Sequence, residues 1–230
     1  MRDMRSDLGN VWRVASRLTA SSGGGRAVMF ISARDGEGTT SIAASFALLA
    51  ARRVEKAAWL IDLDLRRNPA FRAFETGFAD RIGKPGRAFD ASLRQDPIYS
   101  VIPRVADNGA DKLLTAHEID GARLLVTRFR NERLRQGQRI QIRTAPDWWR
   151  ALRKVSDWII VDAPSLERSP AGLAMASQMD GVILVVEADA TSAEDVVAAR
   201  REIEAHGGEI IGVTMNRVRA DARFANRFAG

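Results

Sequence analysis

Cysteine is absent from this chain of 230 residues, which excludes disulfide bonds and thiolate metal sites. The sequence contains no apolar run of about 18 residues, the length that a membrane-spanning helix requires. Its first residues, MRDMRSDLGNVWRVASRLTA, carry charges throughout and lack the apolar core of a signal peptide. We therefore expect a cytoplasmic protein, and a hydrophobic content of 46% is enough for the core of one α/β domain.

Lysine is also scarce, so arginine dominates the net charge of +6. One interpretation is a compositional bias that leaves solvated arginines over the surface. The other is contact with an anionic partner: lipid head groups, nucleic acid or an acidic protein segment. The arginines are scattered rather than clustered with aromatic residues, which argues against nucleic acid.

Apolar runs alternate with amphipathic runs along the chain. The runs that read as buried strands span residues 27–32, 57–65, 157–164, 180–188 and 209–216. The helical patterns cover residues 8–18, 40–53 and the segment from Ser192, a predicted N-cap, to the glycines at 207 and 208. Strands that alternate with helices predict an α/β fold with a doubly wound, mostly parallel sheet.

Polar residues follow several of these strands at their carboxyl ends, where doubly wound sheets bind ligands. A glycine-rich turn at residues 36–40 follows the first strand, and Asp62 and Asp64 close the second. Asp162 and Asn216 close two others. We therefore expect these residues to meet at one edge of the sheet.

The stretch ISARDGEGTTSIA, residues 31–43, has the form of a phosphate cradle. Gly36 and Gly38 let the backbone turn sharply, and the N-terminus of the following helix adds positive potential. An ordinary turn would explain the glycines alone, but their combination with strand-end aspartates indicates phosphate-binding ancestry. Hydroxyl and carboxylate oxygens suit Mg²⁺. The predicted metal ligands are Thr40, Asp62, Asp64 and Asp162.

These segments resemble the cytoplasmic domain of the bacterial tyrosine kinases, or BY-kinases, that accompany capsule and exopolysaccharide export. That family belongs to the deviant P-loop ATPases, close to the MinD and ParA proteins. Its Walker A pattern, S-x-x-x-G-E-G-K-[ST]-T, is matched by Ser32, Gly36, Glu37, Gly38 and Thr40. Its D-x-D-x-R-x-P motif is similar to DLDLRRNP, residues 62–69, the most specific match, and its Walker B strand to VDAP, residues 161–164.

The resemblance implies a P-loop NTPase-like three-layer domain over residues 27–219. An N-terminal helix and linker at 1–26 precede it, and a short tail at 220–230 follows. It also implies a site for ATP or ADP with Mg²⁺, in which Asp62 and Asp64 are the catalytic residues, vestigial if activity is lost. The nucleotide-binding residues that it implies are Arg34, Gly36, Glu37, Gly38, Thr39, Thr40, Ser41 and Asn216.

The sequence departs from the family at several of these places. Thr39 stands where the Walker A lysine belongs, Ala33 replaces the first glycine, and Asp35 adds a negative charge near the expected phosphates. The family's N-terminal E-x-x-R-x-x-R motif appears only as NVWRVAS, which keeps Arg13. The tyrosine-rich tail has no counterpart in the sequence, whose only tyrosine is Tyr99.

The missing lysine affects binding and catalysis differently. One charge-assisted phosphate contact is worth about 1.5–3 kcal/mol, so weak nucleotide binding can survive its loss. Phosphoryl transfer depends more steeply on positioned charge, where one cation is worth about 10³–10⁵ in rate. Arg34, at the place of the extra lysine of MinD-like relatives, can either reach phosphates of its own or a partner subunit or lie exposed on the loop.

The middle of the chain has a different pattern. Residues 122–143 alternate apolar and basic residues and predict a basic hairpin of two strands with its turn near Gln136 and Gly137. This hairpin is either a solvated decoration or a docking surface for an acidic segment or an anionic membrane. Trp148 and Trp149, in the helical segment that follows, are expected in the core.

Three functions remain open. The first is a kinase-like protein, a pseudokinase, that acts at the inner face of the inner membrane by binding a membrane polysaccharide co-polymerase. The second is an active tyrosine autokinase with an atypical P-loop. The third is a MinD- or ParA-like positioning ATPase. DLDLRRNP argues against the third, and Thr39 with the missing tyrosine tail argues against the second, while a homo-oligomer is compatible with all three.

Overall fold

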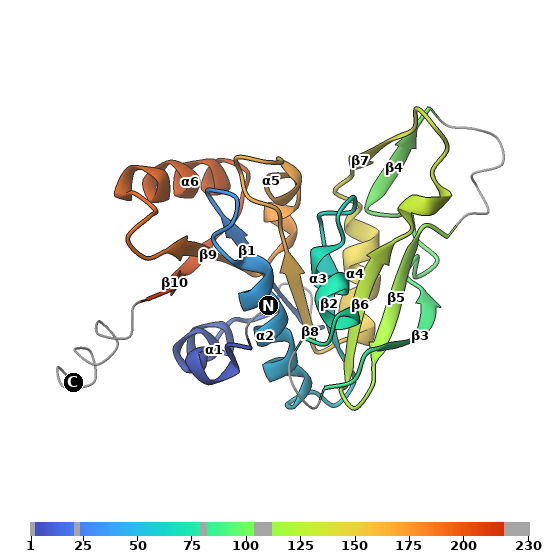
Figure 1. The fold of residues 1–230 in the computed structure, drawn as a ribbon, viewed down its shortest axis with the longest axis horizontal. Helices are drawn as coiled ribbons and strands as arrows, with labels where there is room; N and C mark the ends of the chain where they lie inside the picture. The colour runs from blue at the N-terminus through green and yellow to red at the C-terminus, as the bar shows by residue number, and fades with distance from the viewer. Residues whose placement is uncertain (1–2, 21–23, 79–81, 104–111, 219–230) are drawn as a thin grey trace.

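The computed structural model describes residues 3–20, 24–78, 82–103 and 112–218, and the predicted tail at 220–230 lies outside them. Its main feature is an eight-stranded sheet in the order β10-β9-β1-β8-β2-β6-β5-β3 (Figure 1). The strands are β1 (Arg26–Ser32), β2 (Ala58–Asp62), β3 (Pro85–Asp90), β5 (Leu114–Ile119), β6 (Leu124–Phe129), β8 (Trp158–Asp162), β9 (Gly181–Glu187) and β10 (Ile210–Asn216). The strands from β10 to β6 are parallel, whereas β5 pairs antiparallel with both of its neighbours, β6 and β3.

Helices cover both faces of the sheet and make the three layers that were predicted. The helices on one face are α1 (Gly9–Ala15), α2 (Thr39–Ala51) and α3 (Pro69–Glu75). Those on the other are α4 (Pro146–Val155), α5 (Ala171–Met175) and α6 (Ala193–Ala205). Short 3₁₀ turns occur at Arg5–Asp7, Asn131–Arg133 and Ala176–Gln178. The fold prediction is therefore confirmed.

Continuous apolar runs explain the centre of the sheet. Every residue of β2 and β8 is buried, because helices cover both faces of these strands. Trp148 and Trp149 of α4 are buried in the core, as predicted. Helix α6 begins at the predicted Ser192 cap, where the Ser192 hydroxyl and the Asp195 carboxylate form a capping box.

The predicted basic hairpin at 122–143 is wrong in its pairing. Strand β6 joins the main sheet between β2 and β5, and β7 (Arg139–Ile142) pairs instead with β4 (Tyr99–Ile102) in a separate two-stranded sheet (Figure 1). Gly137 does adopt a turn conformation, with a φ of 83°. Strands β4 and β5 lie earlier in the chain, in segments that were not predicted as strands, and β2 was not recognised as a neighbour of β6. The two alternating runs were therefore read as partners of each other.

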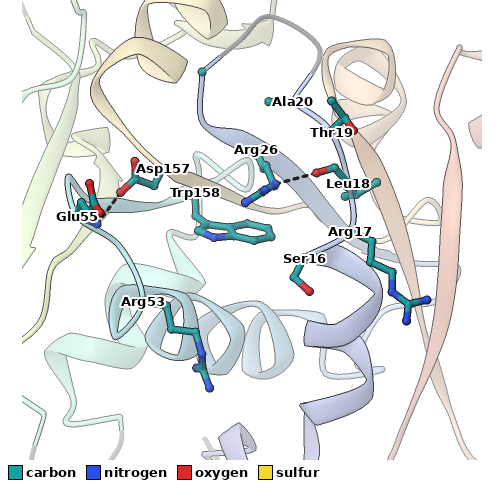
Figure 2. A pocket seen from close by; sticks show the side chains of 11 residues that line it. Ser16, Arg17, Leu18, Thr19, Ala20, Arg26, Arg53, Glu55, Asp157 and Trp158 are labelled. Atoms are coloured by element: carbon teal, nitrogen blue, oxygen red, sulfur yellow. Dashed lines mark hydrogen bonds between the residues drawn. The ribbon is translucent and has the colours of Figure 1, made fainter.

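The N-terminal segment packs directly on the domain. The Trp12 ring of α1 lies 5.6 Å from that of Phe46 and 5.2 Å from that of Trp158. A cavity of about 520 Å³ opens beside Trp158, at the edge where β1 and β8 begin (Figure 2). Arg26 donates a hydrogen bond to the Leu18 carbonyl across it, which ties the end of this segment to β1.

No helix in the described ranges combines the length and apolarity needed to cross a bilayer.

Candidate functional site

The loop between β1 and α2 has the backbone of a phosphate cradle. Gly36 and Gly38 adopt φ angles of 87° and 88°, a left-handed backbone conformation that residues other than glycine rarely adopt. Helix α2 begins at Thr39, and no side chain caps its N-terminus. Its first turn also lacks an acidic residue, so nothing there offsets the positive end of the helix dipole.

Asn216, at the end of β10, holds this loop in place. Its side-chain Nδ2 donates a hydrogen bond of 2.8 Å to the Glu37 carbonyl, and its Oδ1 accepts one from the N–H of Arg217. A Cβ placed on Gly38 would lie 2.0 Å from that Nδ2. The structure thus brings Asn216 to the cradle as predicted, but its amide is occupied by the protein itself. Its contact with a nucleotide stays a prediction.

Substituting the two loop glycines separates backbone strain from this contact. Gly36→Ala should reduce the free energy of unfolding by about 1–2 kcal/mol, because only the left-handed conformation opposes it. Gly38→Ala should cost about 2–4 kcal/mol, because the Asn216 amide must also move and lose its hydrogen bond. Urea denaturation of both variants measures the difference. Equal losses would show that the Asn216 contact does not hold the loop.

Two glutamate carboxylates accept hydrogen bonds from backbone N–H groups of the cradle loop. The buried Glu37 side chain accepts a hydrogen bond from the N–H of Arg34 and another from the Thr191 hydroxyl. Glu167, after β8, accepts a hydrogen bond of 3.0 Å from the N–H of Asp35. The Glu37 side chain is therefore part of the loop's internal structure, and only its backbone remains available for the ligand contact that was predicted.

Asp62, at the end of β2, has a structural role. Its Oδ2 accepts a hydrogen bond of 2.8 Å from the N–H of Ala70 in the first turn of α3, and its Oδ1 accepts one from the N–H of Asp64. Burial, reinforced by the nearby Asp162 charge, raises the pKa of Asp62 well above its usual value. The side chain thus shapes the D-x-D segment, and its predicted catalytic role stays a prediction.

Asp162 lies at the end of β8 with both of its carboxylate oxygens buried. The Thr40 hydroxyl is close enough to interact with this carboxylate, but neither oxygen accepts a hydrogen bond of ordinary geometry from the described residues. Burial raises its pKa to about 7, against the opposing influence of the Thr40 hydroxyl. A buried carboxylate without a partner is costly unless a proton or a cation joins it. This carboxylate, beside Thr40 of the cradle, is therefore where the structure fits a bound Mg²⁺ best.

The structure does not leave all four predicted metal ligands free to bind an ion. Within the described ranges, no group of three acidic or histidine side chains is arranged to hold a metal ion alone. Mg²⁺ usually takes one or two protein ligands together with phosphate oxygens and water. Thr40, Asp162 and Asp64 are the residues that would hold it, while both oxygens of Asp62 are engaged.

The residue at the lysine position carries no charge. Thr39 is the first residue of α2 and is buried. Two positions later, the backbone carbonyl of Ser41 accepts a hydrogen bond from the Ser45 hydroxyl. Arg34, the predicted substitute for the lysine, lies 2.8 Å from Asp195 at the start of α6. A compensating role of Arg34 stays a prediction, and in this structure its charge is directed to α6.

Other cations at this edge were not anticipated. Arg168 lies between Asp35 and Asp64, and the exposed Arg67 is 3.7 Å from Asp35. Arg217 donates to the Gly36 carbonyl at 3.0 Å. Arg168 and Arg217 lie in no motif that the sequence analysis identified, so no pattern along the chain indicated them. Arg67 lies within DLDLRRNP, but the sequence alone does not show that it approaches Asp35.

Asn68 is another site residue that the sequence reading missed. Its side chain donates to the Phe129 carbonyl at 3.0 Å and accepts from the Phe129 N–H at 2.7 Å, as a strand neighbour would. It also precedes α3 with a φ of 48°. Asn68 therefore fixes the DLDLRRNP segment against β6, which gives this motif a structural reason beside any catalytic one.

The comparisons with known proteins agree with this architecture. No protein-family model matches the chain, and no curated protein matches it. Solved structures do: the VpsO kinase domain has a TM-score of 0.61 at 20% identity, over 94% of each chain. The kinase domain of the Escherichia coli tyrosine kinase ETK has a TM-score of 0.54 at 17% identity, over 85% of this chain and 69% of that one.

A third similar structure contains a nucleotide. MinD from Pyrococcus horikoshii, solved with Mg-ADP, has a TM-score of 0.54 at 14% identity, over 84% of this chain and 70% of that one. The fold is that of P-loop kinases and ATPases. Identities this low support the P-loop fold and the resemblance to bacterial tyrosine kinases and MinD-like ATPases, and they leave activity to the residues of the site.

Proposed function

We propose that this protein is a kinase-like component of exopolysaccharide or capsule export that acts by binding and no longer transfers phosphate. The observation that carries this proposal is the uncharged Thr39 at the lysine position of a cradle whose Gly36 and Gly38 keep the left-handed turn. Transfer needs net positive charge at the moving phosphoryl group. Here the cations at the cradle mouth are matched by Asp35, Asp64 and Glu187.

The only tyrosine gives independent support. Tyr99 of β4 is 9% exposed, and its ring packs edge-on against Phe129 at 4.9 Å. A tyrosine packed in this way, in the strand that pairs with β7, is a poor acceptor for a phosphoryl group. Tyr99 is therefore not an accessible acceptor for autophosphorylation.

The proposed partner is the cytoplasmic segment of a membrane polysaccharide co-polymerase. This proposal places the protein in the cytoplasm at the inner face of the inner membrane, with ATP or ADP and Mg²⁺ bound weakly or not at all. It rests on the resemblance to BY-kinases carried by DLDLRRNP and by the shared fold of kinase domains. Contact with anionic lipid through exposed arginines is compatible with it.

Incubation of the purified protein with ATP and Mg²⁺ tests the loss of activity. We expect no phosphotyrosine above the background of Asp64→Ala, which removes a carboxylate predicted to be needed for transfer. A signal that Asp64→Ala abolishes would favour the active autokinase and overturn the proposal.

A further inference from the structure

Arg168 spans the mouth of the phosphate cradle. It belongs to the segment between β8 and α5, and its Nη1 donates to Asp35 Oδ1 in the cradle loop at 2.5 Å. Its Nη2 lies 2.9 Å from Asp64 Oδ2, after β2. A single guanidinium therefore links the loop after β1 to the loop after β2, over the place where phosphates lie in a cradle of this kind.

We propose that Arg168 supplies the phosphate-binding charge that Thr39 cannot, so that a diphosphate or triphosphate group binds between Arg168 and the cradle loop. The inference rests on the proposed function only in taking this edge as a phosphate site. A guanidinium suits the task because its fork of N–H donors matches phosphate oxygens.

The other arginines at this edge are less suited. Arg34 pairs with Asp195 of α6, and Arg217 pairs with Glu187 of β9. Their side chains are 55% and 57% exposed, whereas that of Arg168 is 27% exposed. A less exposed charge is screened less by water and salt, so it contributes more to anion binding.

The contact with Asp64 is one that a ligand can replace. Although Arg168 Nη2 is within ion-pair distance, Asp64 Oδ2 accepts no hydrogen bond from the described residues and is buried. The contact is thus an undirected attraction between charges. A phosphate oxygen that accepts a directed hydrogen bond from Nη2 gains more than this contact loses, while Nη1 remains on Asp35.

The same arrangement explains binding without transfer. Arg168 and Arg67 face the two carboxylates of Asp35 and Asp64, so the positive charge at this place is matched rather than in excess. Arg168 also belongs to the segment after β8, whereas a lysine at position 39 would be part of the first turn of α2. Arg168 can therefore add affinity for phosphates without neutralising the group in transfer.

Calorimetric titration with ADP in EDTA tests this role without metal. Arg168→Gln should weaken ADP binding about 10-fold to 100-fold, the effect of one charged hydrogen bond. Asp64→Asn should tighten it several-fold, because Arg168 loses a competing carboxylate. Arg200→Gln, which removes an exposed arginine of α6, is the matched control and should leave affinity unchanged.

The two substitutions are expected to change ADP affinity in opposite directions, which makes the result decisive. Unchanged or tighter binding by Arg168→Gln would overturn the inference, the tighter case showing that Arg168 blocks the site. Absence of any ADP binding by the wild type would also overturn it, while leaving the proposed loss of transfer intact. Tyrosine phosphorylation by the wild type would overturn the proposed function and not this inference. If Arg168→Gln fails to fold, weaker binding by Asp64→Asn is the contradicting result.

Discussion

Replacing Thr39 with lysine is expected to raise phosphotransfer to an added tyrosine peptide by about 10³-fold or more. Thr39 is the first residue of α2, so a lysine there projects from the helix N-terminus into the cradle. ADP affinity should rise about 10-fold or more with it, because one charge-assisted contact is added. An added peptide is needed because Tyr99 is buried.

Thr39→Met is the matched control for this gain. Methionine is an unbranched side chain without charge, so it tests whether length alone changes the site. We expect Thr39→Met to transfer no phosphate. If Thr39→Lys folds, binds ADP and still transfers none, the missing cation is not the cause, and Ala33 or Asp35 in the same loop becomes the candidate.

Removing Arg153 should reduce the free energy of unfolding by about 3–5 kcal/mol. Its guanidinium is buried between α4 and the start of β9, where it lies 2.5 Å from Asp180 Oδ2. It also donates to the carbonyls of Gly25 and Gln178, both at 2.8 Å. Arg153→Ala leaves the Asp180 carboxylate buried without its counter-charge, although the N–H of Ala27 still donates a hydrogen bond to it.

A neighbouring arginine provides the control. Arg150 of the same helix pairs with Asp147 at an exposed position, and Arg150→Ala should cost less than about 0.5 kcal/mol. Urea denaturation of both variants gives the two values. Adding Asp180→Asn to Arg153→Ala should restore part of the loss, because no orphan charge remains. A loss near 0.5 kcal/mol for Arg153→Ala would show that the buried pair does not stabilise the fold.

The centre of the fold was predictable because its strands are apolar throughout. Strands such as β2 and β8 are covered on both faces, so burial alone identifies them. The cap at Ser192 was predictable because its partner Asp195 lies within the same turn. Strand β6 was misassigned because one alternating run does not specify which strand lies beside it, and its neighbours β2 and β5 are set by the tertiary fold.

The candidate site, too, could be predicted from the sequence only in part. The cradle glycines and the strand-end aspartates follow from position along the chain, and the structure does bring Asp62, Asp162 and Thr40 together. Arg168 does not follow, because its partner Asp35 is 133 positions away. The sequence also does not predict that the Asp62 carboxylate accepts a hydrogen bond from the first turn of α3, because it does not show which carboxylate is free to bind a ligand.

The most direct measurement is the rate at which wild-type protein transfers phosphate from ATP to an added tyrosine peptide with Mg²⁺ present. Phosphopeptide is quantified by mass spectrometry, and Asp64→Ala supplies the background. We expect the wild-type rate to equal that background, because Thr39 adds no positive charge to the cradle and Arg168 is paired with Asp35 and Asp64. A wild-type rate well above it, lost on Asp64→Ala, would contradict a cradle that binds phosphate without transferring it.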